Sequence, residues 1–149
     1  MGAANLTTVV TASLGVALCL YAMRVEHLAS IDSSYRPYCD ISSHASCSRV
    51  LTSPQSRLLK YLGLATPGSR LDFPNTYLGL AFYTFMLTFP IGRRFCHVLY
   101  TLAAAGSMAS SLYLAYVLYA ILKDFCIVCV SSYVVRVVVA SLSQLNTHK

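Results

Sequence analysis

Two cysteines that are separated by two residues, Cys126 and Cys129, stand between two long apolar segments. Cysteine reacts as its thiolate, and a CxxC pair at the start of a helix gains from the positive end of the helix dipole, which lowers a thiol pKa. Two thiols one helical turn apart can open and close a disulfide with little backbone motion. The pair therefore indicates redox chemistry or a metal site. Two buried packing cysteines are the alternative, because free cysteine is often buried.

A second pair, Cys39 and Cys47, lies eight positions apart in a polar part of the chain, where a loop or a bent short helix could bring the thiols together. The other two of the six cysteines stand alone. Cys19 lies inside an apolar segment and is interpreted as a packing residue. Cys96 has no assigned role, because His97 beside it adds only one further ligand to a metal site.

The amino-acid composition indicates whether the chain folds in water or in a membrane. Of its 149 residues, 56% are hydrophobic and 11% are charged, and the mean hydropathy is +0.61. Soluble globular domains differ strongly from this composition, so a lipid bilayer is the expected solvent. The net charge of +6 comes from scattered Lys and Arg residues. Without a basic block or an aromatic-basic pattern, the charge argues against nucleic-acid binding.

The apolar segments predict an all-α integral membrane protein, a single domain over residues 1–149 with a bundle of four transmembrane helices. The predicted spans cover about residues 6–26, 75–92, 95–122 and 125–145, and residues 28–74 form one large loop outside the membrane. Turns at Arg93-Arg94 and at Lys123-Asp124 make neighbouring spans antiparallel. Within the loop, residues 56–64 predict a short amphipathic helix, either on the membrane surface or packed on the loop itself. The small residues at 103–111 predict close helix packing.

Four antiparallel spans place both termini on one side and gather a set of polar and thiol residues at the opposite membrane boundary. These residues are Cys39, Cys47, Asn75, Cys126 and Cys129. Four thiols at one boundary can form a disulfide relay or a tetrathiolate metal site. Their spacing does not match the paired CxxC motifs of common zinc modules, which favours the relay.

Several short motifs occur in a fixed order along the chain. They are Cys39; Ser46-Cys47-Ser48-Arg49; Asn75, Gly79, Phe82 and Tyr83; Ser111-Leu-Tyr-Leu-Ala115; and Asp124-Phe-Cys-Ile-Val-Cys129 with Ser131, Ser132 and Tyr133. With these motifs the sequence resembles the vitamin K epoxide reductase family over nearly its whole length. The resemblance implies a four-helix bundle in the endoplasmic reticulum membrane. The cysteine loop would face the lumen and cap a quinone pocket, with both termini in the cytosol.

The resemblance also implies an enzyme that reduces vitamin K epoxide, vitamin K quinone or both to the hydroquinone. The quinone or epoxide is then the substrate, no tightly bound cofactor or metal is expected, and a thioredoxin-like partner supplies the electrons. We expect a monomer in the lipid bilayer. Two alternatives stay open: a quinone-linked oxidoreductase that forms disulfides without epoxide activity, and a non-catalytic tetraspan protein held by two structural disulfides.

By the same resemblance, Cys126 and Cys129 form the active disulfide, and the Cys129 thiolate engages the ring. Cys39 and Cys47 accept electrons and pass them to Cys126. The resemblance further implies a set of apolar residues for the pocket walls. These residues are Leu51, Leu78, Phe82, Tyr83, Leu114, Leu118 and Leu122.

Asn75 and Tyr133 are implied to hydrogen-bond the two substrate oxygens. A quinone oxygen gains charge during reduction, and donors already aimed at it in a dry pocket stabilise that charge. Tyr133 lies four residues after Cys129 and so shares a helix face with it. The alternatives are a helix-capping role for Asn75 and an ordinary interfacial role for Tyr133.

Arg136 departs from the family, which usually has an uncharged polar residue at this position. It lies seven residues after Cys129 and three after Tyr133, and therefore on the same helix face. A charge inside a membrane span is costly and is functional by default. We expect Arg136 to reach the pocket floor and to bond a substrate oxygen or backbone carbonyls. Snorkelling toward an interface is the alternative.

The distribution of basic residues also fits the resemblance poorly. The loop carries Arg36, Arg49, Arg57, Lys60 and Arg70, whereas the opposite side carries Arg93, Arg94 and Lys149. Positive-inside counting would place the loop in the cytosol. We retain the lumenal placement because disulfide cycling suits an oxidising compartment. The sequon at Asn5-Leu-Thr7 offers a test, since a sugar on Asn5 would place the termini in the lumen.

Overall fold

The computed structural model of the chain describes residues 3–61, 63–66, 68–69 and 72–147. The long helices are α1 (Ala3–Ile31), α4 (Asn75–Leu87), α5 (Phe89–Tyr116) and α6 (Ile127–Thr147), and the π-helix η2 (Val117–Leu122) continues α5. The short elements between α1 and α4 are α2 (Cys47–Leu51), the 3-10 helix η1 (Pro54–Ser56) and α3 (Leu58–Tyr61). Every regular element in these residues is a helix, which confirms the predicted all-α class.

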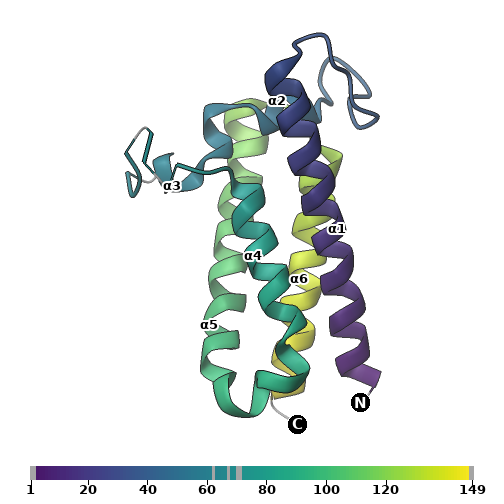
Figure 1. Cartoon of the computed structure of the whole chain (residues 1–149), viewed down its shortest axis with the longest axis vertical. Coiled ribbons are helices and arrows are strands. Elements are labelled where there is room, and N and C mark those ends of the chain that lie inside the picture. The colour runs from purple at the N-terminus through teal and green to yellow at the C-terminus, as the bar shows by residue number, and fades with distance from the viewer. Residues whose placement is uncertain (1–2, 62, 67, 70–71, 148–149) are drawn as a thin grey trace.

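The long helices lie side by side along the long axis of the molecule (Figure 1). α1 packs against α4 and α6, and α5 packs against α6. The short helices and their connecting loop gather at one end, whereas the start of α1 and the end of α6 lie at the other end. The beginnings of α4 and α6 therefore lie beside the loop.

Three helices in the described part of the chain are long and apolar enough to cross a membrane. They are Asn5–Ile31, Phe95–Leu122 and Ile127–Leu145. The remaining predicted span, residues 75–92, contains α4, which has 13 residues. At 1.5 Å per residue, such a helix covers about 20 Å of a hydrocarbon core that is roughly 30 Å thick. The membrane character is thus supported, and the count of four spans stays a prediction.

The connection after α4 has two breaks, one at Thr88 and one at Cys96. α4 ends before its C-cap residue Thr88, and α5 begins at Phe89 with Pro90 in its first turn. Proline lacks an N–H group and suits the first turn of a helix, which explains why a new helix begins here. Residues 93–94, which we predicted as the turn, are helical, but α5 consists of two helices that meet at a kink at Cys96 (φ −125°, ψ 31°). The predicted turn therefore lies directly before this kink, and the long apolar helix that follows covers Phe95–Leu122.

The turn before α6 is built on Lys123, which adopts the left-handed conformation (φ 53°) and ends η2. Cys126 then occupies the position before the first residue of α6, and its carbonyl accepts the Val130 N–H at 2.9 Å. An N-cap residue has this bonding pattern. The turn thus places the first cysteine of the CxxC pair at the N-terminus of α6.

Close helix packing occurs between α1 and α4, at Gly15. A Cβ atom at Gly15 would lie 2.3 Å from the ring of Tyr83. That ring is fully buried, and its hydroxyl donates to the carbonyl of Ser132 on α6 at 2.6 Å. Gly106, in the small-residue segment 103–111 for which we predicted close packing, has no atom within 4 Å of such a Cβ. In the same segment Ala104, Ser107 and Ser111 are buried, and α5 packs against α6. The prediction of close packing therefore holds for one face of the segment and not for the face that carries Gly106.

The predicted amphipathic helix at residues 56–64 is not continuous. η1 ends at Ser56, and α3 covers only Leu58–Tyr61. Arg57 between them has a non-helical backbone (φ −111°, ψ 79°), and its guanidinium pairs with the Asp72 carboxylate at 3.0 Å. Residue 62 lies outside the described residues. The predicted helix is therefore replaced by two short elements at an ion-paired bend.

Candidate active site

The loop brings Cys39 and Cys47 together through hydrogen bonds around α2. The Ser46 side chain caps α2 by accepting the Arg49 N–H at 3.3 Å. The Asp40 carboxylate accepts the Ser48 N–H at 3.0 Å and the Ser48 hydroxyl. The Cys39 and Cys47 sulfurs and an Asp40 oxygen consequently lie within 4.8 Å of one another.

Two further contacts fix this loop on the segment that precedes α6. The Arg49 guanidinium donates to both oxygens of Asp124 at 3.1 Å, and the Phe125 N–H donates to the His44 carbonyl at 2.9 Å. The Arg49 side chain is 58% exposed, whereas that of Asp124 is 6% exposed. The loop is therefore held at a buried carboxylate directly before the CxxC pair.

These contacts place the two cysteine pairs next to each other. The Cys47 and Cys126 sulfurs are 3.3 Å apart, and both residues are fully buried. The Cys126 sulfur also accepts the Cys129 N–H at 3.2 Å. All four cysteines are free thiols. Their sulfurs therefore form a continuous path from Cys39 through Cys47 and Cys126 to Cys129.

The loop thiols are held in their protonated form. A hydrogen bond with Cys126, together with burial, raises the pKa of Cys47 well above its usual range. Burial and a hydrogen bond with Cys47 raise the pKa of Cys39 to about 12. Burial also acts to raise the pKa of Asp40, but the hydrogen bonds from Ser48 outweigh it and hold that pKa below its usual value. A reduced Cys39 and Cys47 pair is thus stored as thiols beside an ionised carboxylate.

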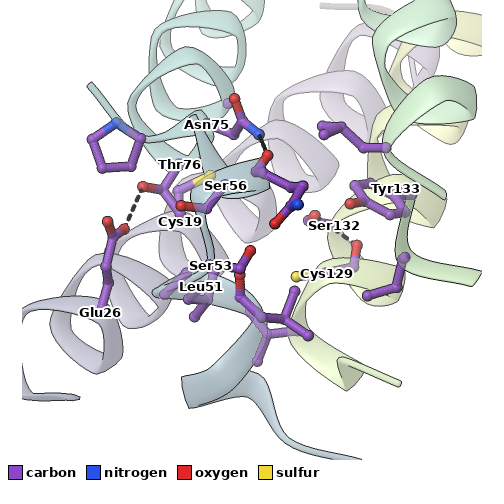
Figure 2. A pocket seen from close by; sticks show the side chains of 18 of the residues that line it. Cys19, Glu26, Leu51, Ser53, Ser56, Asn75, Thr76, Cys129, Ser132 and Tyr133 are labelled. Atoms are coloured by element: carbon purple, nitrogen blue, oxygen red, sulfur yellow. Dashed lines mark hydrogen bonds between the residues drawn. The ribbon is translucent and has the colours of Figure 1, made fainter. Parts of the chain in front are cut away.

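A cavity lies beside this sulfur path, between the helices of the bundle and the loop (Figure 2). Many residues that the sequence predicted for the site line it. They are Leu51, Asn75, Leu114, Leu118, Leu122, Cys129, Tyr133 and Arg136. The loop contributes Ser53, Gln55 and Ser56 to one end, so it covers the cavity. The lining is predominantly apolar with a few polar groups, which is typical of a small-molecule site.

Three predicted wall residues lie outside the cavity: Leu78, Phe82 and Tyr83. The rings of Phe82 and Tyr83 each have a centroid 5.8 Å from the guanidinium carbon of Arg136, which itself lines the cavity. They share a helix face with Gly79 but lie deeper in the bundle, beyond the guanidinium. Leu78 is on a different side of α4 from Gly79, which does line the cavity.

Asn75 lines the cavity and also ties the loop to α4. Its side-chain oxygen accepts the Leu58 N–H at 2.8 Å, and its amide nitrogen donates to the Gln55 carbonyl at 3.4 Å. The N-cap position of α4 belongs to Pro74. The capping role that we considered for Asn75 is therefore replaced by a bond to the loop backbone, and its role toward a substrate stays a prediction.

Tyr133 lies on the cavity wall one helical turn beyond Cys129 (Figure 2). No hydrogen bond to its hydroxyl occurs within the part of the chain that the structure describes. The hydroxyl thus remains able to donate to a ligand. This placement agrees with the predicted helix face, and the role itself is not tested by the geometry.

Arg136 is buried in the bundle, with 8% of its surface exposed. Its Nη1 donates to the Ser111 hydroxyl at 3.4 Å, and its side chain lies over the rings of Phe82 and Tyr83. The guanidinium therefore points into the bundle and does not snorkel. Arg136 lines the cavity, and its bond to a substrate oxygen stays a prediction.

Sequence reasoning missed the contribution of α1 to the cavity. Cys19, Ala22 and Glu26 line it, and the Glu26 carboxylate accepts the Thr76 hydroxyl at 3.3 Å (Figure 2). Spacings of three and four residues place the α1 residues on one helix face. That spacing was visible in the sequence, but the apolar residues around α1 gave no sign of which face meets the cavity. Cys96 is exposed and is absent from the cavity lining.

A cation would find three donor groups in the loop, from Cys39, Asp40 and Cys47. Both oxygens of Asp40 already accept hydrogen bonds from Ser48. The fourth nearby group, the Cys126 sulfur, belongs to the other cysteine pair. The arrangement is thus better suited to thiol exchange than to a closed tetrahedral metal site.

A bundle with helices long and apolar enough to cross a membrane, in which two cysteine pairs meet beside an apolar cavity, has the features of a membrane-embedded oxidoreductase. Residues 6–143 match the family model described as "Vitamin K epoxide reductase family". The chain is 37% identical to "Vitamin K epoxide reductase complex subunit 1" of Mus musculus over 141 residues, which cover 91% of this chain and 86% of the mouse protein. The Rattus norvegicus protein of the same name is 36% identical over the same coverage. The chain therefore belongs to the vitamin K epoxide reductase family and is an enzyme, as predicted.

Proposed function

We propose that the protein reduces vitamin K epoxide, vitamin K quinone or both to the hydroquinone within the membrane. The proposed path takes electrons from Cys39 and Cys47 to Cys126 and Cys129. One observation carries the proposal: the sulfurs of Cys47 and Cys126 are 3.3 Å apart, which joins a loop dithiol to a dithiol at the cavity. A non-catalytic protein with two separate structural disulfides would not require a contact between the two cysteine pairs.

The reaction begins at Cys129, the cysteine of the CxxC pair that lines the cavity. Its thiolate adds to a ring carbon of the quinone, and the electron pair displaced from the ring moves onto a ring oxygen. Cys126 then attacks the Cys129 sulfur, so that the S–S bond forms as the C–S bond breaks. The ring gains two electrons and two protons and leaves as hydroquinone. With the epoxide, the same two electrons and two protons give the quinone and water.

Asn75 and Tyr133 supply the hydrogen bonds that stabilise charge on the ring oxygens. The Asn75 amide is held by the loop backbone at Leu58 and Gln55, so it is fixed before the substrate binds. Donors that are already oriented cost no reorganisation during the reaction. Binding of the ring beneath the loop thus places it between these donors and the Cys129 sulfur.

The loop cysteines then restore the thiols. Cys47 attacks Cys126, which releases Cys129 as a thiolate, and Cys39 attacks Cys47, which releases Cys126. The Cys129 N–H that points at the Cys126 sulfur stabilises the thiolate that leaves in this second step. A thioredoxin-like dithiol partner finally reduces the Cys39–Cys47 disulfide.

The same proposal assigns the protein to the endoplasmic reticulum membrane, with four spans, the loop in the lumen and both termini in the cytosol. A monomer with no tightly bound cofactor is sufficient, because the four thiols of one chain complete the path. An oxidising lumen suits the cycling of these disulfides.

The direct test uses membranes that contain the protein, dithiothreitol as the reductant and a menaquinone as the substrate. We expect hydroquinone formation with the natural sequence and its loss with Cys129→Ser, while Cys96→Ser retains activity because Cys96 lies outside the cavity. Equal rates for all three proteins would refute a thiol-based reductase. Vitamin K epoxide in place of the quinone decides between epoxide activity and quinone reduction alone.

A further inference from the structure

Glu26 of α1 is the one acidic side chain that lines the cavity in the described part of the chain. It is half-buried, and its carboxylate accepts the Thr76 hydroxyl of α4 at 3.3 Å. The two ion pairs among the described residues are made by other carboxylates, those of Asp124 and Asp72. The proposed reaction does not yet use Glu26. A group that can gain and lose a proton therefore lies at the cavity without a role.

Glu26 and Thr76 lie on one side of the cavity, and Cys129 and Tyr133 lie on the other side (Figure 2). Asn75, the residue before Thr76, begins α4 and also lines the cavity. The two ring oxygens of a para-quinone point in opposite directions. When Tyr133 bonds one of them, the other points toward the wall that α1 and α4 form.

Reduction of the ring requires two protons as well as two electrons. Cys129 must lose its own proton before it attacks as a thiolate, so Cys126 holds the one proton that the dithiol can still supply. The Tyr133 hydroxyl can donate to the first ring oxygen. The Asn75 amide can hydrogen-bond the second oxygen, but an amide group does not ionise and cannot release its proton to it. The second oxygen therefore needs an acid at the wall of α1 and α4.

We propose that Glu26 is the catalytic acid that protonates this second ring oxygen. The inference rests on the proposed function, because it takes as substrate a ring that Cys129 attacks, and it adds the source of a proton. As the thiolate adds to a ring carbon, the displaced electron pair moves onto the ring oxygen. The O–H bond of the Glu26 carboxyl group breaks, and its proton forms the new O–H bond on the ring. Thr76 orients the carboxyl group through their hydrogen bond.

The proton transfer is favourable, because the ring oxygen becomes phenolic as it is reduced. The ordinary pKa of a glutamic acid is about 4.3 and that of a phenol is about 10, so the phenolic oxygen holds the proton more tightly. Glu26 is half-exposed and can take a new proton from water before the next cycle. The proton thus enters from the side of the cavity that lies away from the sulfur path.

Charged and titratable groups on the neighbouring elements face Glu26. On the loop, the Arg57 guanidinium attracts the Glu26 carboxylate, but it is already paired with Asp72 at 3.0 Å. Further groups line the same cavity from α1 and α6. They are Cys19, Cys129, Tyr133 and Arg136. Glu26 is therefore the only carboxyl group of the described residues that can deliver a proton inside the cavity.

A single turnover of the full chain in detergent separates ring reduction from reduction of the thiols. Fully reduced protein, freed of reductant, is mixed with an equal amount of menaquinone, and the loss of quinone absorbance is followed over a range of pH. The rate should rise with pH as Cys129 ionises and fall at higher pH as Glu26 loses its proton. General acid catalysis contributes about 100- to 10,000-fold, so Glu26→Gln should slow ring reduction by at least about 100-fold and remove the fall at higher pH.

Three comparisons separate the chemistry from packing. Glu26→Gln keeps an oxygen that accepts the Thr76 hydroxyl, so its Tm should stay close to that of the natural protein. Thr76→Val removes the same hydrogen bond but keeps the acid, so it should slow the reaction by less and retain the fall at higher pH. Asp32→Asn removes an exposed carboxylate just beyond α1, outside the cavity lining, and should change neither the rate nor its pH dependence.

The inference is overturned if Glu26→Gln reduces the ring at the natural rate or keeps the fall at higher pH. A natural protein whose rate does not fall at higher pH overturns it as well, and that result needs no variant to fold.

The proposed function fails in a different way. If the natural chain reduces neither menaquinone nor the epoxide, the reductase proposal is wrong, and the role of Glu26 fails with it. If the natural chain reduces the ring and Glu26→Gln behaves in the same way, only the assignment of Glu26 is wrong, and its bond to Thr76 serves to join α1 to α4.

Discussion

Cys47 lies between the two cysteine pairs. Its sulfur is 3.3 Å from that of Cys126 and within 4.8 Å of that of Cys39. Thiol-disulfide exchange requires the attacking sulfur to reach the disulfide directly, and only a small approach separates this contact from an S–S bond of about 2.05 Å. The loop pair can therefore pass electrons to the cavity pair without a large movement of the loop.

We predict that Cys39→Ser accumulates a disulfide between Cys47 and Cys126. Cys47 can still attack the Cys126–Cys129 disulfide, but without Cys39 no thiol remains in the loop to release it. Mass spectrometry of peptides from the non-reduced protein measures the linkage after treatment with mild oxidant. Cys96→Ser, at an exposed site, is the matched control and should not accumulate it. A Cys39→Ser protein in which Cys47 remains a free thiol would contradict the relay.

The two roles of Asn75 can be separated by one substitution. Asn75→Asp keeps an oxygen to accept the Leu58 N–H but removes the amide donor and adds a charge that repels a ring oxyanion. Loss of a donor to a developing oxyanion costs about 100-fold in kcat, so we expect a fall of that size. The Asp variant loses the bond to the Gln55 carbonyl and keeps the one from Leu58, so its Tm should fall by less than that of Asn75→Ala, which loses both. If kcat of the Asp variant equals that of the natural protein, Asn75 serves only to hold the loop.

At the scale of elements, the ion pair between Arg49 and Asp124 fastens the loop to the start of α6. Asp124 is nearly buried, so Arg49→Gln leaves a buried carboxylate with fewer donors, at a cost of about 1 to 3 kcal/mol. We expect a lower yield of the Cys47–Cys126 disulfide in the Cys39→Ser background, measured by mass spectrometry. Arg57→Gln breaks the other ion pair of the loop, where the hydrogen bond from Arg57 keeps the pKa of Asp72 below its usual value. It should leave the disulfide yield unchanged, and an equal loss in both variants would contradict a specific role for Arg49.

The packing of α1 on α4 depends on the absence of a side chain at Gly15. Gly15→Ala would place a Cβ 2.3 Å from the buried ring of Tyr83, and overpacking of this kind costs about 1 to 3 kcal/mol. Gly106→Ala is the matched control, because its Cβ would contact nothing within 4 Å while the gain in helix propensity is the same. Thermal unfolding in detergent should show a lower Tm for Gly15→Ala and an unchanged or higher Tm for Gly106→Ala. Equal Tm values in the two variants would show that α1 can move away from Tyr83 without cost.

The elements that could be predicted are those fixed by helical spacing and by the side of the membrane. Tyr133 and Arg136 line the same cavity as Cys129 because residues three, four and seven positions apart share a helix face. Spacing along one helix does not determine depth in the bundle, so Phe82 and Tyr83 were placed in the cavity although Arg136 lies between them and it. The end of α4 was missed because the apolar pattern continues past Thr88, where Pro90 starts a new helix.

For the whole molecule, the loop and its short helices gather at one end of the bundle, and α1 begins and α6 ends at the other (Figure 1). The Cys47 and Cys126 sulfurs meet at the loop end. The sequence predicted that both cysteine pairs would meet, because antiparallel spans leave their starting residues on a common side. It could not predict that the loop would cover the cavity through Asn75, since those bonds are made to the backbone at Leu58 and Gln55. Nearly every residue has a backbone N–H and a carbonyl, so the residue types in the sequence do not show which of them bonds to Asn75.

The side of the membrane on which this loop end lies is the remaining property of the whole molecule. Ile41 is 67% exposed in the loop, and Ile41→Asn completes a sequon with Ser42 and Ser43. With the loop in the lumen, we predict a glycan on this site and none at Asn5, measured as a mobility shift that glycosidase removes. The basic residues of the loop argue for the opposite orientation, but Arg49 and Arg57 are each paired with a carboxylate, which weakens their effect on the charge balance. A glycan on Asn5 would show that the loop faces the cytosol, where glutathione and thioredoxin would keep the four thiols reduced.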